Sequence, residues 1–192
     1  HLKRAVKVIT GNHKKAQDAT SLYYLGICYW KQGKIDLALD YLYRCTWDYE
    51  WTSAGYTLVA QIEAAQKKWD RALDAADRAC KANTQNVDAL TTKAIILRTM
   101  GKYEQALTTN EYALSVDPLC FVAMNEMACL KDDAKFQEIN KHMRNEPYNY
   151  IETATRYGQM GLFKEAANVM TLATESDFPE LNAYPMVHYH LG

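Results

Sequence analysis

The sequence has few of the features that mark membrane, nucleic-acid-binding or disulfide-rich proteins. No apolar run reaches the about 18 residues that a membrane helix requires, and no secretory leader is visible at the N-terminus, which begins at His1 without a methionine. The 192 residues carry a formal net charge of −1, so no basic surface is indicated that would neutralise nucleic-acid phosphates. We therefore expect a cytoplasmic protein with no nucleic-acid or membrane partner.

The sequence lacks the cysteine arrangements of disulfide-rich and zinc-binding proteins. The five cysteines are an odd number, and no two of them form a CxxC pair. Disulfide frameworks use even numbers of cysteines, and zinc sites need closely spaced ligands. We predict reduced thiols that pack as small buried apolar side chains, and no metal site.

Motifs for catalysis are absent as well. Gly33-Lys34 and Gly101-Lys102 lack the preceding glycine and the following Ser or Thr of a phosphate-binding loop, and no HExxH, GxSxG or dinucleotide fingerprint occurs. The adjacent Asp132 and Asp133 fit a solvated turn better than an acid–base pair, because no apolar residues are arranged to shift their ionisation. We predict a protein that is not an enzyme and has no cofactor.

What the sequence does contain is an internal repeat. Three stretches begin at Ala19, Ser53 and Val87, at an interval of 34 residues. The eighth residue of each stretch is small: Gly26, Ala60 and Ala94. The twentieth is always alanine: Ala38, Ala72 and Ala106. The seventeenth is large and apolar: Ile35, Trp69 and Tyr103. Self-similarity at a fixed period indicates a repeat array.

Each stretch is predicted to form two antiparallel helices. In the third, Leu90, Ala94 and Leu97 recur at helical spacing, and Gly101 fits the left-handed conformation that follows a helix C-terminus. A second apolar stripe then runs as far as Pro118, which cannot continue a helix. The small residues let the two helices approach closely, and the large seventeenth residue is expected to fill the wedge beside them.

This pattern resembles the tetratricopeptide repeat. The residues that carry the resemblance are Leu22, Leu25, Gly26, Tyr29, Gly33, Ala38, Leu42 and Cys45, then Tyr56, Ala60, Trp69, Ala72, Ala76 and Ala79, then Leu90, Ala94, Gly101, Tyr103, Ala106, Ala113 and Pro118. The resemblance implies an all-α fold, a right-handed superhelix of antiparallel helix pairs.

The repeat also predicts how the chain is divided. We expect one array over residues 1–192, with repeats at 19–52, 53–86, 87–120, 121–146 and 147–184. The fourth is shorter than the others, so its packing is expected to differ locally, and a longer connection, Thr174 to Ala183, follows the fifth helix pair. Residues 1–18 and 185–192 fit partial repeats, and we therefore expect a fragment of a larger protein.

The resemblance further implies a concave face lined by the first helix of each repeat. Its groove positions, which we take as the partner-binding candidates, hold Tyr23, Ile27, Trp30, Lys31, Thr57, Gln61, Thr91, Ile95, Arg98, Asn125, Asp132, Tyr148 and Ile151. The family's two-carboxylate clamp for chaperone tails needs Lys, Arg and Asn at set places. Those places hold Tyr23, Ile27, Leu58, Asp88 and Thr92, so a chaperone-tail ligand is not expected.

The first repeat is unusually aromatic, and two interpretations of it stay open. Tyr23 and Trp30 suit anchoring of a partner side chain, or packing against the neighbouring N-terminal helix. The aromatic residues of this repeat together suit sugar stacking or contact with another domain; alternatively, Trp47 to Trp51 fold over the first helix pair as a plug. These residues are Tyr23, Tyr24, Tyr29, Trp30, Tyr41, Tyr43, Trp47, Tyr49 and Trp51.

Two functions follow from these patterns. The first is a scaffold that binds a protein, a peptide or a neighbouring domain of the same polypeptide through its concave face. The alternative is an accessory repeat module of a larger bacterial carbohydrate-active protein, packed against a missing N-terminal domain. It depends on residues 116–126 and 146–157, which are similar to runs in large bacterial proteins that join a β-rich N-terminal domain to such an array.

Overall fold

The computed structural model describes residues 1–10, 18–131, 136–176 and 178–191, and every regular element within them is a helix. The helices are α1 (Leu2–Thr10), α2 (Thr20–Lys31), α3 (Ile35–Cys45), α4 (Tyr49–Ala65), α5 (Trp69–Ala82), α6 (Val87–Thr99), α7 (Tyr103–Val116), α8 (Phe121–Lys131), α9 (Phe136–Met143), α10 (Pro147–Gln159), α11 (Phe163–Thr174), α12 (Pro179–Asn182) and α13 (Pro185–Leu191).

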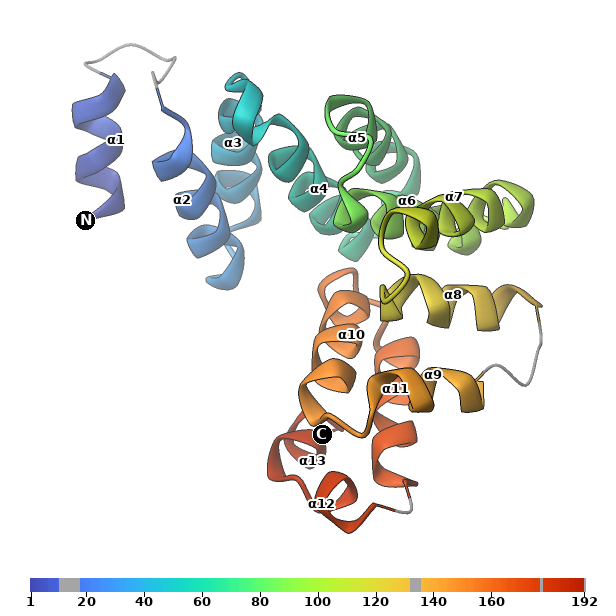
Figure 1. Ribbon diagram of the computed structural model, residues 1–192. Helices are drawn as coiled ribbons and strands as arrows, with labels where there is room; N and C mark the ends of the chain where they lie inside the picture. Colours follow the sequence, from blue (N-terminus) through green and yellow to red (C-terminus); the bar gives the residue numbers. More distant parts are fainter. Residues whose placement is uncertain (11–17, 132–135, 177, 192) are drawn as a thin grey trace.

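Consecutive helices pack as antiparallel pairs. The most extensive contacts are α2 with α3, α4 with α5, α6 with α7, and α10 with α11 (Figure 1). The terminal helices add to the stack at either end, with α1 against α2 and α13 against α11 and α10. The all-α class and the antiparallel pairing predicted from the repeat are confirmed.

Left-handed residues follow the first helix of the pairs α2–α3, α4–α5, α6–α7 and α10–α11. Gly101, which follows the C-cap Met100 of α6, has φ +76°, and the Lys102 amide donates to the Leu97 carbonyl at 2.9 Å. A side chain rarely adopts this φ, so glycine satisfies the turn without strain. The prediction for Gly101 is confirmed, and in the second pair Lys67 takes the same conformation with φ 61°.

Small residues bring the paired helices together. Ala38, Ala72 and Ala106 are fully buried. A Cβ added to Gly26 would lie 2.7 Å from Leu42 Cγ, so α2 and α3 approach more closely than a side chain would allow. The wedge interpretation of the seventeenth position is wrong for Tyr103, because its place at the start of α7 leaves it 61% exposed.

Two helices differ from what the repeat predicts: α4 begins earlier, and α12 is an additional helix. Helix α4 begins at Tyr49, one turn before the predicted start at Ser53. Its N-cap, Asp48, accepts a hydrogen bond from the Glu50 amide at 3.2 Å and another from the Ala19 amide at 3.1 Å, so one carboxylate caps α4 and holds the start of α2. The connection from Thr174 to Ala183 contains the short helix α12.

The chain turns back after α8. Helix α9 has only 8 residues, and α10 to α13 lie beneath the middle of the array instead of extending it (Figure 1). Helix α10 contacts α4 as well as α8. The irregular packing expected near the fourth repeat therefore takes the form of a reversal that lays α10 against the first helices of earlier pairs.

Candidate functional site

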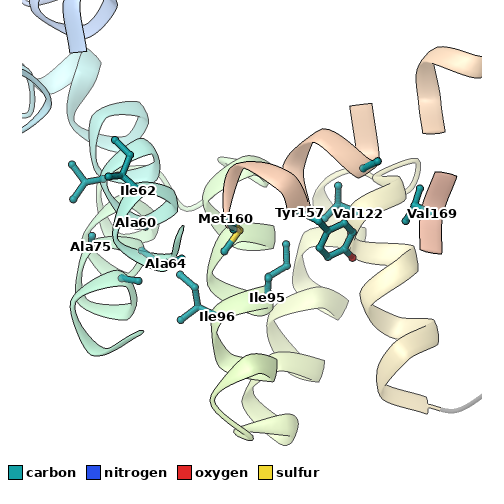
Figure 2. Packing of buried hydrophobic residues seen from close by; sticks show 14 of the residues in the cluster. Ala60, Ile62, Ala64, Ala75, Ile95, Ile96, Val122, Tyr157, Met160 and Val169 are labelled. Carbon is teal, nitrogen blue, oxygen red and sulfur yellow. The ribbon is translucent and has the colours of Figure 1, made fainter. Parts of the chain in front are cut away.

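Helix α10 organises the candidate site. It begins at Pro147, after the N-cap Glu146, whose carboxylate accepts from the Tyr148 amide. Its buried residues recur at three- and four-residue spacing, which gives the helix one apolar face. At its C-terminal end, Tyr157 and Met160 belong to one buried apolar cluster with Ile95 and Ile96 of α6 and Val122 of α8 (Figure 2).

A buried polar cluster joins α10 to three other helices. Glu126 of α8 accepts from Arg98 Nε of α6 at 2.8 Å and from the Tyr157 hydroxyl of α10 at 2.9 Å. Asn125 Nδ2 donates to the Tyr157 oxygen at 2.8 Å, and Arg98 Nη2 lies 3.3 Å from Glu165 Oε1 of α11. These five side chains connect α6, α8, α10 and α11.

Burial controls the ionisation of this cluster. Desolvation raises the pKa of the Glu126 carboxyl, against the opposing hydrogen bonds from Arg98 and Tyr157. Burial also raises the pKa of Tyr157 well above its ordinary value. Desolvation alone would lower the pKa of Arg98, but its hydrogen bond to Glu126 and the charge of that carboxylate outweigh it, so the net shift is upward. The guanidinium therefore stays charged, and at the centre of the cluster Glu126 and Tyr157 are fully buried.

A pocket of about 520 Å³ lies where α10 and α11 meet the C-terminal ends of α2 and α4. Its lining residues are Trp30, Lys31, Ala65, Ala154, Thr155, Gly158, Gln159, Gly161, Phe163, Ala166 and Met170. This volume is within the about 300–1,000 Å³ of ligand sites in proteins. Both the early and the late part of the chain contribute walls, so the pocket depends on the reversal of the array.

Two glycines give the pocket its form. Gly161 has φ +74°, and a Cβ there would lie 3.3 Å from Ala65 Cα, so the α10–α11 turn approaches the end of α4 closely. At Gly158, by contrast, an added Cβ would meet no atom within 4 Å. This helical glycine leaves open the space that a side chain would occupy.

The predicted groove residues differ in burial and in whether they line the pocket. Trp30 and Lys31 line the pocket, whereas Thr57, Gln61, Thr91, Ile95 and Asn125 are buried inside the molecule. Arg98 is engaged in the polar cluster, Ile27 and Ile151 are half-buried, and Tyr148 is 63% exposed, with its hydroxyl 3.3 Å from that of Tyr184. Asp132 lies outside the described residues. These residues therefore do not line one continuous open groove, because α10 covers part of the face on which they lie.

The aromatic first repeat is partly packed and partly exposed. Tyr23 lies against Trp51 with ring centroids 4.6 Å apart, so it packs on α4. Trp47 and Tyr49 are 65% and 84% exposed, which rules out a plug formed by the whole Trp47–Trp51 stretch.

Cysteine burial follows the prediction at one position. Cys45 is fully buried, but Cys28 and Cys129 are exposed, so buried packing is wrong for those two.

The helix pairs define the fold class, which is that of tetratricopeptide-repeat proteins. Among solved structures the chain is similar to a tetratricopeptide repeat protein from Parabacteroides merdae, at 19% identity and a TM-score of 0.63, over 92% of this chain and 72% of that one. It is also similar to MamA, at 18% identity and a TM-score of 0.57, over 91% of this chain and 88% of that one.

A third similar structure is YrrB, described as a TPR protein with an unusual peptide-binding site. The identity is 14% and the TM-score 0.57, over 98% of this chain and 96% of that one. Comparison with protein-family models and with curated proteins gives no match. At these identities the similarity establishes the fold.

Among the residues described, none of the helices has the length and apolar character needed to cross a bilayer. Within the same ranges, no group of three His, Cys, Asp or Glu side chains is placed to hold a metal ion.

Proposed function

We propose that this chain is a non-catalytic scaffold that binds a protein or peptide segment in the pocket between α2, α4, α10 and α11. The observation that carries the proposal is the pocket itself, about 520 Å³ in volume and lined mainly by apolar side chains. Trp30, one of the predicted groove residues, forms part of its wall. Large aromatic side chains at such positions commonly anchor a partner.

The surroundings of the pocket support binding without catalysis. Glu126 and Tyr157 are fully buried and hydrogen-bonded to each other, and neither lines the pocket. The lining residues include one charged side chain, Lys31, and no acid or histidine that would act as a proton acceptor. Peptide binding is described for the structurally similar YrrB, and we extend it here to this chain as a hypothesis.

A selection experiment tests this function. A phage library of random linear peptides is selected against the full chain, and the retained clones are rescreened against Gly158→Leu, which fills the pocket, and against Ala167→Leu, which adds the same side chain at an exposed site of α11. We expect clones that lose binding to Gly158→Leu and keep it with Ala167→Leu. Clones that bind both variants equally, or a selection with no clones, would overturn pocket binding.

A second candidate function is favoured by one observation. Trp47 lies just before α4, and Tyr49 is the first residue of that helix. Both are largely exposed, which suits contact with another domain or a sugar. We propose, as the alternative, an accessory module of a larger bacterial carbohydrate-active protein that packs against a neighbouring domain there. The test is protection of Trp47 from oxidation in the full-length gene product relative to this segment, and equal oxidation in both would reject it.

A further inference from the structure

We infer that the pocket takes an acidic peptide segment, with a large apolar side chain inside it and a carboxylate side chain beside Lys31. The inference rests on the proposed function and adds the chemistry of the partner. Its three parts are an apolar interior, unneutralised cations at the margin and polar groups for a peptide main chain.

The interior suits a bulky apolar anchor. Ala65 and Ala154 present only methyl groups, and Met170 and the ring of Trp30 supply larger apolar surfaces. Gly158 leaves additional space at the centre of the α10 wall. Apolar anchors that fill such spaces contribute most of the binding energy in peptide complexes.

The margin of the pocket carries positive charge without a matching acid. Lys31 Nζ lies 5.0 Å from the centroid of the Trp30 ring, and no carboxylate is within ion-pair distance of it in the described part of the chain. Lys67, two residues after Ala65, and Lys164, next to Phe163, are also exposed. The pocket is therefore complementary to a negative ligand.

Two arginines differ from Lys31 because each has a carboxylate partner. Arg98 pairs with Glu126 and Glu165, and Arg156 pairs with Asp88 at 2.8 Å. Arg98 of α6 and Arg156 of α10 are thus neutralised within the molecule. Lys31 is left for an external carboxylate.

Two polar side chains favour a peptide over a simple fatty acid. Thr155 and Gln159 line the same wall of the pocket, four residues and about one helical turn apart. The Thr155 hydroxyl and the Gln159 amide both donate and accept hydrogen bonds, which a peptide main chain needs and a hydrocarbon chain cannot use.

The test uses the peptides whose binding depends on an open pocket and repeats the selection on Lys31→Glu. We expect Asp or Glu beside a large apolar residue in clones from the natural chain, and Lys or Arg there in clones from Lys31→Glu. For individual peptides, Glu→Gln replacement should weaken binding about fivefold by calorimetry, which is the size of an exposed charge contact. Lys102→Glu, at an exposed lysine in the α6–α7 turn, is the matched control and should keep the acidic preference.

Each other outcome has a distinct meaning. Pocket-dependent clones without an acidic bias, or with the same bias in Lys31→Glu, overturn the inference but leave the scaffold function. Absence of any pocket-dependent clone overturns both. If dodecanoate binds the natural chain and not Gly158→Leu, while no peptide does, the pocket holds a fatty acid and the peptide inference is wrong.

Discussion

Arg156 and Asp88 form an ion pair at 2.8 Å although 68 residues separate them in the chain. Asp88 lies in the first turn of α6 and Arg156 in the last turn of α10, so each charge also suits the dipole of its own helix. The pair joins the two parts of the chain directly beside the buried face of α10. Because both side chains are partly exposed, its role is to orient α10 more than to stabilise it.

The first prediction concerns the strength of this pair. In a double-mutant cycle with Asp88→Asn and Arg156→Gln, we expect a coupling free energy of roughly 0.2–1 kcal/mol, because exposed pairs are screened by solvent. Urea unfolding at low and high salt measures it, and the coupling should shrink at high salt. Zero coupling at low salt would mean that the pair is not formed in solution.

The second prediction concerns the buried pair of Arg98 and Glu126. Arg98→Met should destabilise the protein by about 3–5 kcal/mol, because it leaves a fully buried carboxylate without its cation. The double variant Arg98→Met with Glu126→Leu should recover most of this loss, since no uncompensated charge remains. Chemical denaturation measures both. A single variant as stable as the double would contradict a charged Glu126.

The third prediction separates two nearby glycines. Gly158→Ala should stabilise the protein by roughly 0.5–1 kcal/mol, because alanine favours a helix and the new Cβ meets no atom within 4 Å. Gly161→Ala should destabilise it by about 1–2 kcal/mol, because φ is +74° and the new Cβ would lie 3.3 Å from Ala65 Cα. Thermal melting compares the two. The same sign for both would show that the turn differs from this description.

The fourth prediction concerns the Cys45 thiol. Burial raises its pKa from the ordinary 9.0 to about 12, and its Sγ donates to the Leu42 carbonyl at 3.0 Å. At pH 8 we expect iodoacetamide to modify the exposed Cys28 and to spare Cys45 until the protein unfolds. Mass spectrometry of the labelled peptides measures this.

The same shift has a consequence for stability. Because the unfolded thiol loses its proton first, the contribution of Cys45 is fully present below pH 9.0 and is lost as pH rises toward about 12. Cys45→Ala should reduce the slope of unfolding free energy in that range. An unchanged slope would contradict the shift.

The helix ends and pair contacts could be predicted because they depend on local requirements. Gly101 ends α6 through its own backbone conformation, and Ala38, Ala72 and Ala106 permit close approach wherever the repeat puts them. Such requirements recur every 34 residues and are visible as a pattern. The exposed Tyr103 shows the limit of this reasoning, because burial depends on which neighbour covers a ring.

The candidate site was only partly predictable. Three of the predicted groove positions take part in it: Trp30 and Lys31 line the pocket, and Arg98 pairs with Glu126 in the polar cluster. The rest of the cluster does not show in the sequence, because Glu165, which pairs with Arg98, and Tyr157, which donates to Glu126, reach it only after the chain reverses. One signal was available: Glu126 is an acid in the otherwise mostly apolar Phe121–Leu130 stretch, and a buried acid needs a cation nearby.

The position of α10 has a consequence for how the protein unfolds. In an open array each repeat touches only its neighbours, and the stability is close to a sum of local terms, so the ends unravel independently. Here Met160 and Tyr157 are buried with Ile96 and Val122, which couples the last helix pair to the middle of the chain. Losing that pair also uncovers the central repeats, and we therefore expect helical content and tryptophan fluorescence to report one common transition.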